Sequence, residues 1–371
     1  MVFLYIIIFL IVLLVCYIIY RKSIKYHAKI YFNSKGSIAH IIAQTKSLEK
    51  PYKPTWWLFN CHLHTIRGMR YRKSSKMTKS VRRELIKYED GGTSALDWFE
   101  TQEMQNDTPI LFIIHTYAGG TREPCCNNLA ETAVKHGWRA VVFNNRCCSG
   151  APITSSRMIA VIEVDDIEFA VNHVLENFKP KFMFMAGFSL GAYQTVQYCM
   201  LSGKGIDAAA CISHTYNPVE AELILHQPIQ SRLYLPFIMS KLIHFAKKNP
   251  YLNCPEAENS KSTLEYDEAI WCHGLTKYKN GTELYAALSV YEKIPNIKVP
   301  LLFLGSTDDP FTLKKYMPIK EVEKSDNIAL VAFPEGGHVS FLTGNDGNKS
   351  IIDTIIPDWF ETFMNDKIKN Q

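Results

Sequence analysis

The chain has 371 residues, which suffices for one large α/β domain with an insertion or for two ordinary domains. With 47% apolar and 21% charged residues it can bury a sizeable core, which excludes a disordered or collagen-like chain. Lys and Arg number 41 against 36 Asp and Glu, and the resulting net charge of +5 is too small and too scattered to indicate nucleic acid as the partner.

The first apolar segment, residues 2–20, carries no ionised side chain. As a helix it would span about 28 Å, close to the hydrocarbon thickness of a thin bilayer such as that of the endoplasmic reticulum. A cleaved signal peptide would need basic residues before the run and a small-residue cleavage site after it, and a core helix would show a polar face. The sequence therefore predicts a transmembrane anchor within residues 1–22.

Two sequence features bear on which side of the membrane the rest of the chain lies. Four basic residues follow the apolar run and favour a cytoplasmic location for the domain that follows: Arg21, Lys22, Lys25 and Lys29. Three glycosylation sequons favour the lumen instead: Asn106, Asn280 and Asn348. We predict a single-pass protein of the endoplasmic reticulum or another internal membrane, with the domain after the anchor on the cytoplasmic side.

The ten cysteines form no spaced framework of the secreted kind. Cys61, His62 and His64 could suggest a metal site, but no second ligand pair at zinc spacing accompanies them. We expect neither a metal nor an organic cofactor.

Apolar runs and helical patterns alternate through the rest of the chain, as is typical of a mostly parallel sheet with helices on both faces. Residues 23–53 form a polar, tyrosine-rich linker and N-terminal region in this prediction, and residues 54–371 form the α/β domain. Helices are expected at 159–177 and 192–201. The expected parallel strands are 110–114, 140–143, 182–186, 209–212, 299–304 and 328–333.

A long interruption at about 214–295 is rich in apolar residues, so it cannot be a bare loop. We predict a helical insertion before the strand 299–304. The insertion either completes the outer layer of the sheet or forms a cap over an active site.

The third expected strand leads into Gly187-Phe188-Ser189-Leu190-Gly191, followed by a helical pattern. A serine between two glycines at a strand-to-helix turn is typical of a nucleophile elbow, in which small neighbours permit a strained backbone that exposes the hydroxyl. The N–H of Leu190 would face the same space and stabilise an oxyanion. The sequence thus predicts Ser189 as a nucleophile.

A serine nucleophile needs a base and an acid that orients the base, and in this fold they follow in the order acid, then histidine. Asp308 and Asp309 follow the strand 299–304, and His338 follows the next strand through a flexible loop. Counting three residues from Gly305 favours Asp308 as the acid. Asp309, before Pro310, remains the alternative acid and is expected to shape the loop.

A second oxyanion donor is expected in the loop after the first strand, which reads His115-Thr116-Tyr117-Ala118-Gly119-Gly120. We predict the backbone N–H of Tyr117.

Several further motifs make the chain resemble the α/β-hydrolase-domain family of membrane-anchored lipid hydrolases, which includes the bacterial YheT-type proteins and human hydrolase-domain proteins 1, 2 and 3. The resemblance runs from about Trp56 to the last helix. The motifs are Asn60-Cys61-His62-Leu63-His64-Thr65, Asp90-Gly91-Gly92 with Leu96-Asp97-Trp98, Phe143-Asn144-Asn145-Arg146, Tyr266-Asp267-Glu268 and Asp308-Asp309-Pro310.

The resemblance implies an α/β-hydrolase fold and a serine hydrolase of acylglycerols, phospholipids or other carboxylic esters, held to a membrane by an N-terminal helix. The implied triad falls on Ser189, Asp308 and His338. Two departures bear on substrate choice: Thr116 replaces a glycine beside the oxyanion loop, and Cys147 replaces a glycine after Asn145-Arg146.

Two alternatives to hydrolysis stay open. An alcohol could intercept the acyl-enzyme, which would make the protein an acyltransferase with the same triad. The fold could also persist as a catalytically inactive membrane scaffold. The expected partners are a lipid ester substrate and the membrane; the sequence indicates no protein partner.

Overall fold

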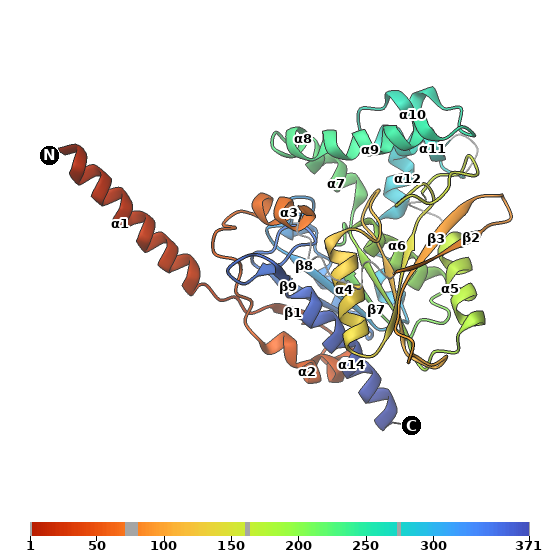
Figure 1. Cartoon of the computed structure of the whole chain (residues 1–371), viewed down its shortest axis with the longest axis horizontal. Helices are drawn as coiled ribbons and strands as arrows, with labels where there is room; N and C mark the ends of the chain where they lie inside the picture. Colours follow the sequence, from red (N-terminus) through yellow and green to blue (C-terminus); the bar gives the residue numbers. More distant parts are fainter. Residues whose placement is uncertain (1, 71–80, 160–163, 273–275, 371) are drawn as a thin grey trace.

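A nine-stranded sheet forms the centre of the computed structural model, which describes residues 2–70, 81–159, 164–272 and 276–370 (Figure 1). The strand order is β1-β9-β8-β7-β6-β4-β5-β3-β2. Its six central strands are parallel and coincide with the six predicted ones, with small shifts at their ends. They are β4 (Ile110–Ile114), β5 (Arg139–Asn144), β6 (Met183–Phe188), β7 (Ala208–Ile212), β8 (Leu301–Ser306) and β9 (Ile328–Phe333).

Three antiparallel strands at the sheet edges were not expected. β1 (Lys29–Phe32) pairs with β9, while β2 (Arg82–Lys87) and β3 (Thr93–Phe99) form a hairpin that pairs with β5 through β3. β1 lies within the segment predicted as a linker, residues 23–53. The folded domain therefore begins before residue 54, because this short strand completes the sheet.

Separate hydrophobic clusters cover the two faces of the sheet. Phe112 and Ile114 of β4 enter one cluster and Leu111 and Ile113 enter the other, as the alternation of a strand requires. The first cluster includes α5 (Asp165–Asn177) and α6 (Leu190–Leu201), and the second includes α2 (Ile38–Gln44), α4 (Pro124–Lys135) and α14 (Ile352–Lys369). Residues 160–163, at the start of the helix predicted over 159–177, lie outside the described residues.

The predicted insertion is helical and forms a layer of its own at one end of the sheet (Figure 1). Several of its side chains line a cavity together with Ser189, so it is a cap as well as part of the core. Its helices are α7 (Pro218–Leu225), α8 (Gln230–Leu233), α9 (Leu235–Lys248), α10 (Pro255–Asn259), α11 (Thr263–Trp271) and α12 (Gly281–Leu288).

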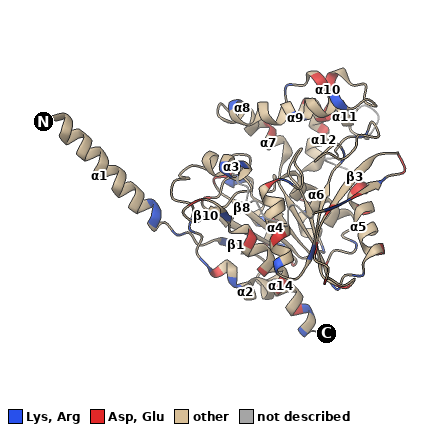
Figure 2. Ribbon diagram, in the orientation of Figure 1, with Lys and Arg blue, Asp and Glu red and all other residues tan. Residues whose placement is uncertain are grey.

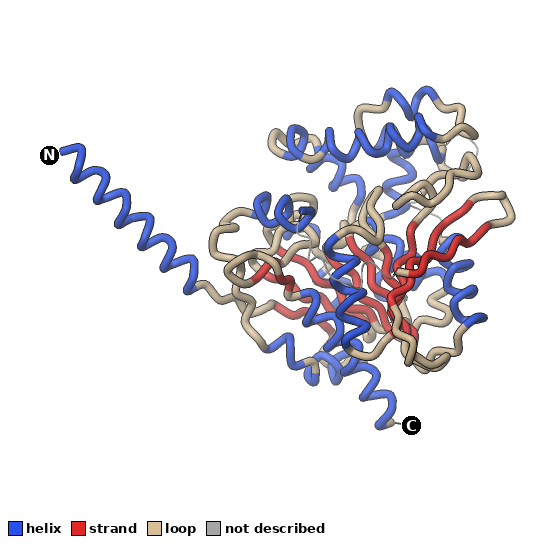
Figure 3. Tube along the Cα trace, in the orientation of Figure 1, coloured by secondary structure: helices blue, strands red, loops and turns tan. Residues whose placement is uncertain are grey.

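Helix α1 (Val2–Ser23) projects from the body and packs against it only at its last turns (Figure 3). Among the described residues it is the one helix long and apolar enough to cross a membrane. Its apolar stretch is exposed, which excludes the alternative of a core helix. Figure 2 shows basic residues where α1 meets the body.

Short elements complete the fold. They are α3 (Cys61–Arg70), α13 (Ile319–Val322), β10 (Leu342–Thr343), β11 (Lys349–Ser350) and the 3-10 turns Lys46–Glu49, Ile294–Asn296 and Lys314–Tyr316.

Candidate active site

Ser189 occupies the sharp turn between β6 and α6, with φ 55° and ψ −113°. This left-handed backbone is strained for a residue with a side chain and is typical of functional sites. The flanking glycines permit it, because a Cβ on Gly191 would overlap the carbonyl oxygens of Ile114 and His115, and one on Gly187 would overlap the backbone of Gly191. The strand-to-helix turn predicted for Ser189 is therefore present.

His338 lies within hydrogen-bonding distance of Ser189. Its Nε2 is 2.8 Å from Ser189 Oγ, and its backbone N–H donates to Thr65 Oγ1 of α3 at 2.9 Å. The ring of Phe311 lies 4.5 Å from the imidazole, centroid to centroid. The imidazole is largely buried, with 8% of the residue exposed.

The carboxylate that contacts His338 is Asp309, so the sequence-based choice of Asp308 is wrong on this point. Asp309 Oδ2 and Oδ1 lie 2.9 and 3.1 Å from Nδ1 of His338. Asp308 Oδ1 instead accepts a hydrogen bond from the N–H of Gly337 at 3.1 Å, and burial raises its pKa to about 6.

The error has a structural cause. Gly305 does not close β8, since the strand pairs with β9 through Ser306. The turn therefore starts later than expected. Asp309 also accepts the N–H of Phe311 at 2.8 Å, so it both shapes the loop and contacts the imidazole.

The loop after β4 wraps around the carboxylate of Glu123. Thr116 donates to this carboxylate with both its N–H, at 3.1 Å, and its hydroxyl, at 2.6 Å. A Cβ on Gly119 would overlap the same carboxylate. The threonine that departs from the family pattern thus supplies a hydrogen bond that holds the loop.

Leu190 and Tyr117, the two predicted oxyanion donors, line one cavity with Ser189 and His338. Leu190 is the first residue of α6, where backbone N–H groups have no partner within the helix. Their role as donors remains a prediction.

A carboxyl group of the cap, that of Asp267 in α11, holds the side chain of Tyr117. Its hydroxyl donates to Asp267 Oδ1 at 3.1 Å, and Tyr285 donates to Asp267 Oδ2 at 2.7 Å. Burial raises the pKa of Asp267 to about 7. The sequence marked Asp267 only as part of a family motif, because its contacts join segments far apart in the chain.

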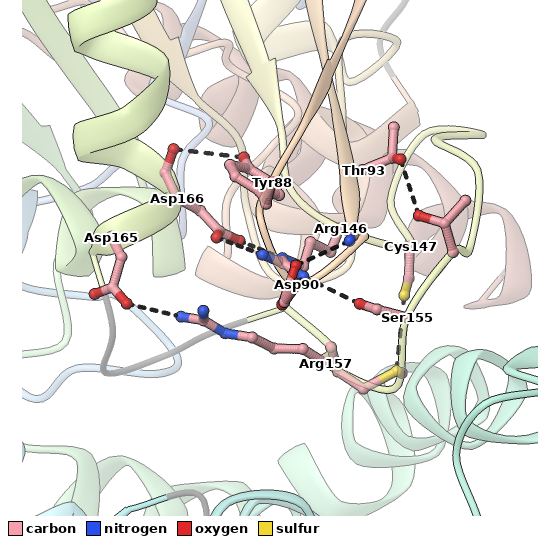
Figure 4. A network of polar contacts seen from close by, with 12 residues as sticks. Tyr88, Asp90, Thr93, Arg146, Cys147, Ser155, Arg157, Asp165 and Asp166 are labelled. Carbon is pink, nitrogen blue, oxygen red and sulfur yellow. Dashed lines mark hydrogen bonds and ion pairs between the residues drawn. The ribbon is translucent and has the colours of Figure 1, made fainter.

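Two other family motifs meet around Arg146 (Figure 4). Its buried guanidinium bonds to Asp166 at 2.6 and 2.8 Å and to Asp90 at 2.7 Å, and it lies 4.3 Å from the centroid of Tyr88. A Cβ on Gly92 would overlap this guanidinium. These motif residues hold the β2–β3 hairpin to the sheet and do not reach the serine.

The neighbouring Asn145 connects the same segment to the site. Its backbone N–H donates to Nε2 of the buried His115 at 3.1 Å, which leaves Nδ1 to donate to the Thr116 carbonyl at 2.6 Å. Burial lowers the pKa of His115, which favours this neutral form.

The cavity above Ser189 has a volume of about 550 Å³. It passes between α3 on one side and α7, α9 and α11 on the other, and its walls are mainly apolar. A space of this size and character suits an acyl chain or another apolar group.

The candidate metal ligands from the sequence do not come together. His62 Nδ1 lies 2.9 Å from the Tyr234 hydroxyl, and burial lowers the pKa of His64, which contacts the Leu58 backbone, to about 4. Elsewhere in the described residues, Glu123, Cys125 and Cys126 bring their side chains within 4.8 Å of one another. Because Glu123 is already bonded to Thr116 and burial raises the pKa of the Cys126 thiol, this group is a poor cation site as it stands.

The chain is similar in sequence to a known family and to several known proteins. Residues 109–345 match the family described as alpha/beta hydrolase fold. An abhydrolase domain-containing protein of Dictyostelium discoideum is 30% identical over 327 residues, covering 85% of this chain and 82% of that protein. The mouse protein named phospholipase ABHD3 is 27% identical and covers 79% of this chain and 74% of its own length.

A solved structure agrees on the fold. The esterase Pf2001 of Pyrococcus furiosus superimposes with a TM-score of 0.56 at 15% identity, covering 79% of this chain and 95% of the esterase. Because the family match spans more than half of the chain and the Dictyostelium relative extends it over most of the remainder, this chain belongs to the alpha/beta hydrolase fold family, as its motifs predict.

Proposed function

We propose that the protein is a membrane-anchored serine hydrolase that cleaves carboxylic ester bonds of lipids, acylglycerols or phospholipids, through an acyl-enzyme on Ser189. The observation that carries this proposal is the continuous chain of contacts from Ser189 Oγ to His338, at 2.8 Å, and from His338 to Asp309, at 2.9 Å. The name of the mouse relative, a phospholipase, supports a lipid substrate.

In this mechanism His338 Nε2 takes the proton of Ser189 as the hydroxyl attacks the ester carbonyl. Asp309 holds the proton on Nδ1, which fixes the tautomer and stabilises the imidazolium. The N–H groups of Leu190 and Tyr117 receive the oxyanion, after which the imidazolium protonates the leaving alcohol. Water, activated by the same histidine, then releases the fatty acid and restores the serine.

The membrane part of the proposal rests on α1. The helix is exposed along its apolar length and ends in Arg21 and Lys22, which favours a catalytic domain on the cytoplasmic side of an internal membrane. A lipid substrate would then be present at high local concentration beside the cavity.

Labelling with a fluorophosphonate tests the nucleophile. The full chain should be labelled at Ser189, and Ser189→Ala should abolish both labelling and hydrolysis of a lipid ester. Ser202→Ala, at the opposite end of α6, serves as the matched control and should keep both. Wild-type protein that takes no label and cleaves none of a panel of acylglycerols and phospholipids would contradict the proposal. Adding an alcohol to the assay reveals any acyl transfer.

A further inference from the structure

Six large apolar side chains are exposed on two neighbouring elements. One group belongs to α3 and the loop before it, and the other to α8 and the start of α9. Each side chain is at least 37% exposed, and two of the six, Met69 and Phe237, also line the cavity. Exposed apolar side chains that gather in this way mark interaction surfaces. We call them the apolar face: Phe59, Leu63, Met69, Ile229, Leu233 and Phe237.

Contacts between aromatic and polar side chains join this face to α1. The ring of Tyr17 in α1 lies 6.3 Å from that of Phe59, edge to face. Further along, His62 of α3 meets Tyr234, between α8 and α9, at 2.9 Å. Figure 1 shows the same succession, with α3 and α8 on the side of the body from which α1 projects.

The end of α1 is fixed to the body and is not a loose tether. The buried Arg21 guanidinium bonds to both carboxylate oxygens of Glu335, at 3.0 and 3.1 Å. It also donates to the carbonyls of Trp56, at 3.3 Å, and Leu58, at 3.2 Å. These bonds fix the direction in which α1 leaves the domain, so inserting α1 in a membrane also sets which face of the domain meets that membrane.

The cavity lies between the two halves of the apolar face. Its walls include Met69 of α3 on one side and Phe237 of α9 on the other, with Ser189 deeper inside. A lipid tail passing between these side chains would reach the serine without crossing open water.

The charge around the face suits a lipid surface. Lys22, Arg70 and Arg232 lie at the end of α1, at the end of α3 and in α8, respectively (Figure 2). Basic side chains around an apolar surface are typical of proteins that lie in the interface of a membrane and contact phosphate groups of the lipids.

We infer that the apolar face rests in the same membrane surface that α1 enters, so that the cavity opens directly to the lipid leaflet. This inference rests on the proposed function, because it requires α1 to lie in a membrane. It adds a second contact with lipid, made by the catalytic domain itself, and it names the route by which the substrate arrives.

Photo-crosslinking tests the contact without using activity. The full-length chain is reconstituted in vesicles of phosphatidylcholine with some phosphatidylserine and a phosphatidylcholine that carries a diazirine in its acyl chain. Label is expected in peptides from α1, from α3 and from residues 229–237, in the wild-type chain and equally in Ser189→Ala. Label confined to α1 would overturn the inference, and absence of label from α1 would contradict the anchor itself.

A matched pair of variants tests the consequence for turnover. The first replaces Leu63, Ile229 and Leu233 by Ser; none of the three lines the cavity. The control replaces the exposed Leu85, Leu201 and Ile368 by Ser on other surfaces of the protein.

The first variant should hydrolyse a vesicle-borne lipid ester about tenfold more slowly, since apolar contact area sets interfacial binding, while a dissolved short-chain ester is cleaved at the wild-type rate. The control should match wild type on both substrates. Equal rates for both variants on vesicles would overturn the inference. A wild-type chain that is inactive on every ester would instead count against the proposed function and leave the crosslinking result to decide the membrane contact.

Discussion

Replacing Asp309 by Asn should remove most activity while the fold remains. The carboxylate accepts the Nδ1 proton of His338 at 2.9 Å and is itself buried. An amide at this place can donate a hydrogen bond to Nδ1, which would leave the imidazole proton on Nε2. Nε2 could then no longer accept the proton of Ser189 Oγ. In the serine-protease triad this tautomer change costs about 10⁴ in kcat, which corresponds to about 5.5 kcal/mol of transition-state stabilisation.

The neighbouring Asp308 supplies the matched control. In the structure Asp308 accepts the Gly337 N–H at 3.1 Å, and Asp308→Asn keeps an oxygen that can accept this bond. The side chain at 308 does not contact the imidazole. We expect its kcat to remain within about tenfold of wild type, because it lies outside the line of proton transfer. The assay is kcat on a dissolved ester, with melting temperature measured in parallel.

The two variants should also differ in how their stability depends on pH. Burial raises the pKa of Asp308 to about 6, from the ordinary 3.8, so the folded chain holds this proton more tightly than the unfolded chain. The contribution to stability is therefore present at about pH 4 and lost as the pH rises through 6, with an upper limit of about 3 kcal/mol. Asp308→Asn has no carboxyl group to titrate here, so its stability should rise relative to that of wild type as the pH increases from about 4 to above 6. If Asp308→Asn abolishes turnover at an unchanged melting temperature while Asp309→Asn stays active, the assignment of the acid is refuted.

Three further outcomes follow from contacts around the site. Asp267→Asn should lower kcat more than it raises KM for a dissolved ester above pH 7, because the amide accepts the Tyr117 hydroxyl less strongly than the ionised carboxylate does. The variant should also lose the decline in stability that wild type shows as the pH rises towards 7. Deleting residues 2–18 should release the protein from membranes with activity retained. Deleting residues 2–22 should also lower the melting temperature, since it removes Arg21 and leaves Glu335 without its ion-pair partner, at a cost of about 1–3 kcal/mol. Equal melting temperatures for the two deletion variants would contradict the role of Arg21. Gly191→Ala should leave little folded protein in a circular-dichroism melt, because its Cβ would overlap backbone oxygens of the neighbouring strand end.

The central strands could be predicted because their residues are apolar on both faces, a pattern that a buried parallel sheet imposes locally. The turn at Ser189 could be predicted for the same reason. Its backbone needs glycine at 187 and 191, so the signal lies within five consecutive residues. β1 gives no such signal. It has only four residues and pairs with β9, about 300 residues away, so its stability comes from the sheet it joins.

The choice between Asp308 and Asp309 depends on tertiary contacts for a similar reason. Both follow β8, and their difference lies in where the strand ends and in which of them meets a histidine from another loop. Adjacent side chains point in different directions, so an error of one residue in the strand end exchanges their roles.

The loop between β9 and His338 connects the candidate catalytic histidine to α1. Glu335 accepts the guanidinium of Arg21, at the end of α1, and the hydroxyl of Tyr26, at 2.7 Å. Three residues later His338 contacts the serine, and its backbone is fixed to α3 through Thr65. We therefore expect a change in the position of α1 to act on the segment that carries His338. Deleting residues 2–22, which removes Arg21, should for this reason alter kcat on a dissolved ester, where access to the membrane has no part in the rate. Deleting residues 2–18 keeps Arg21 and should leave this kcat unchanged.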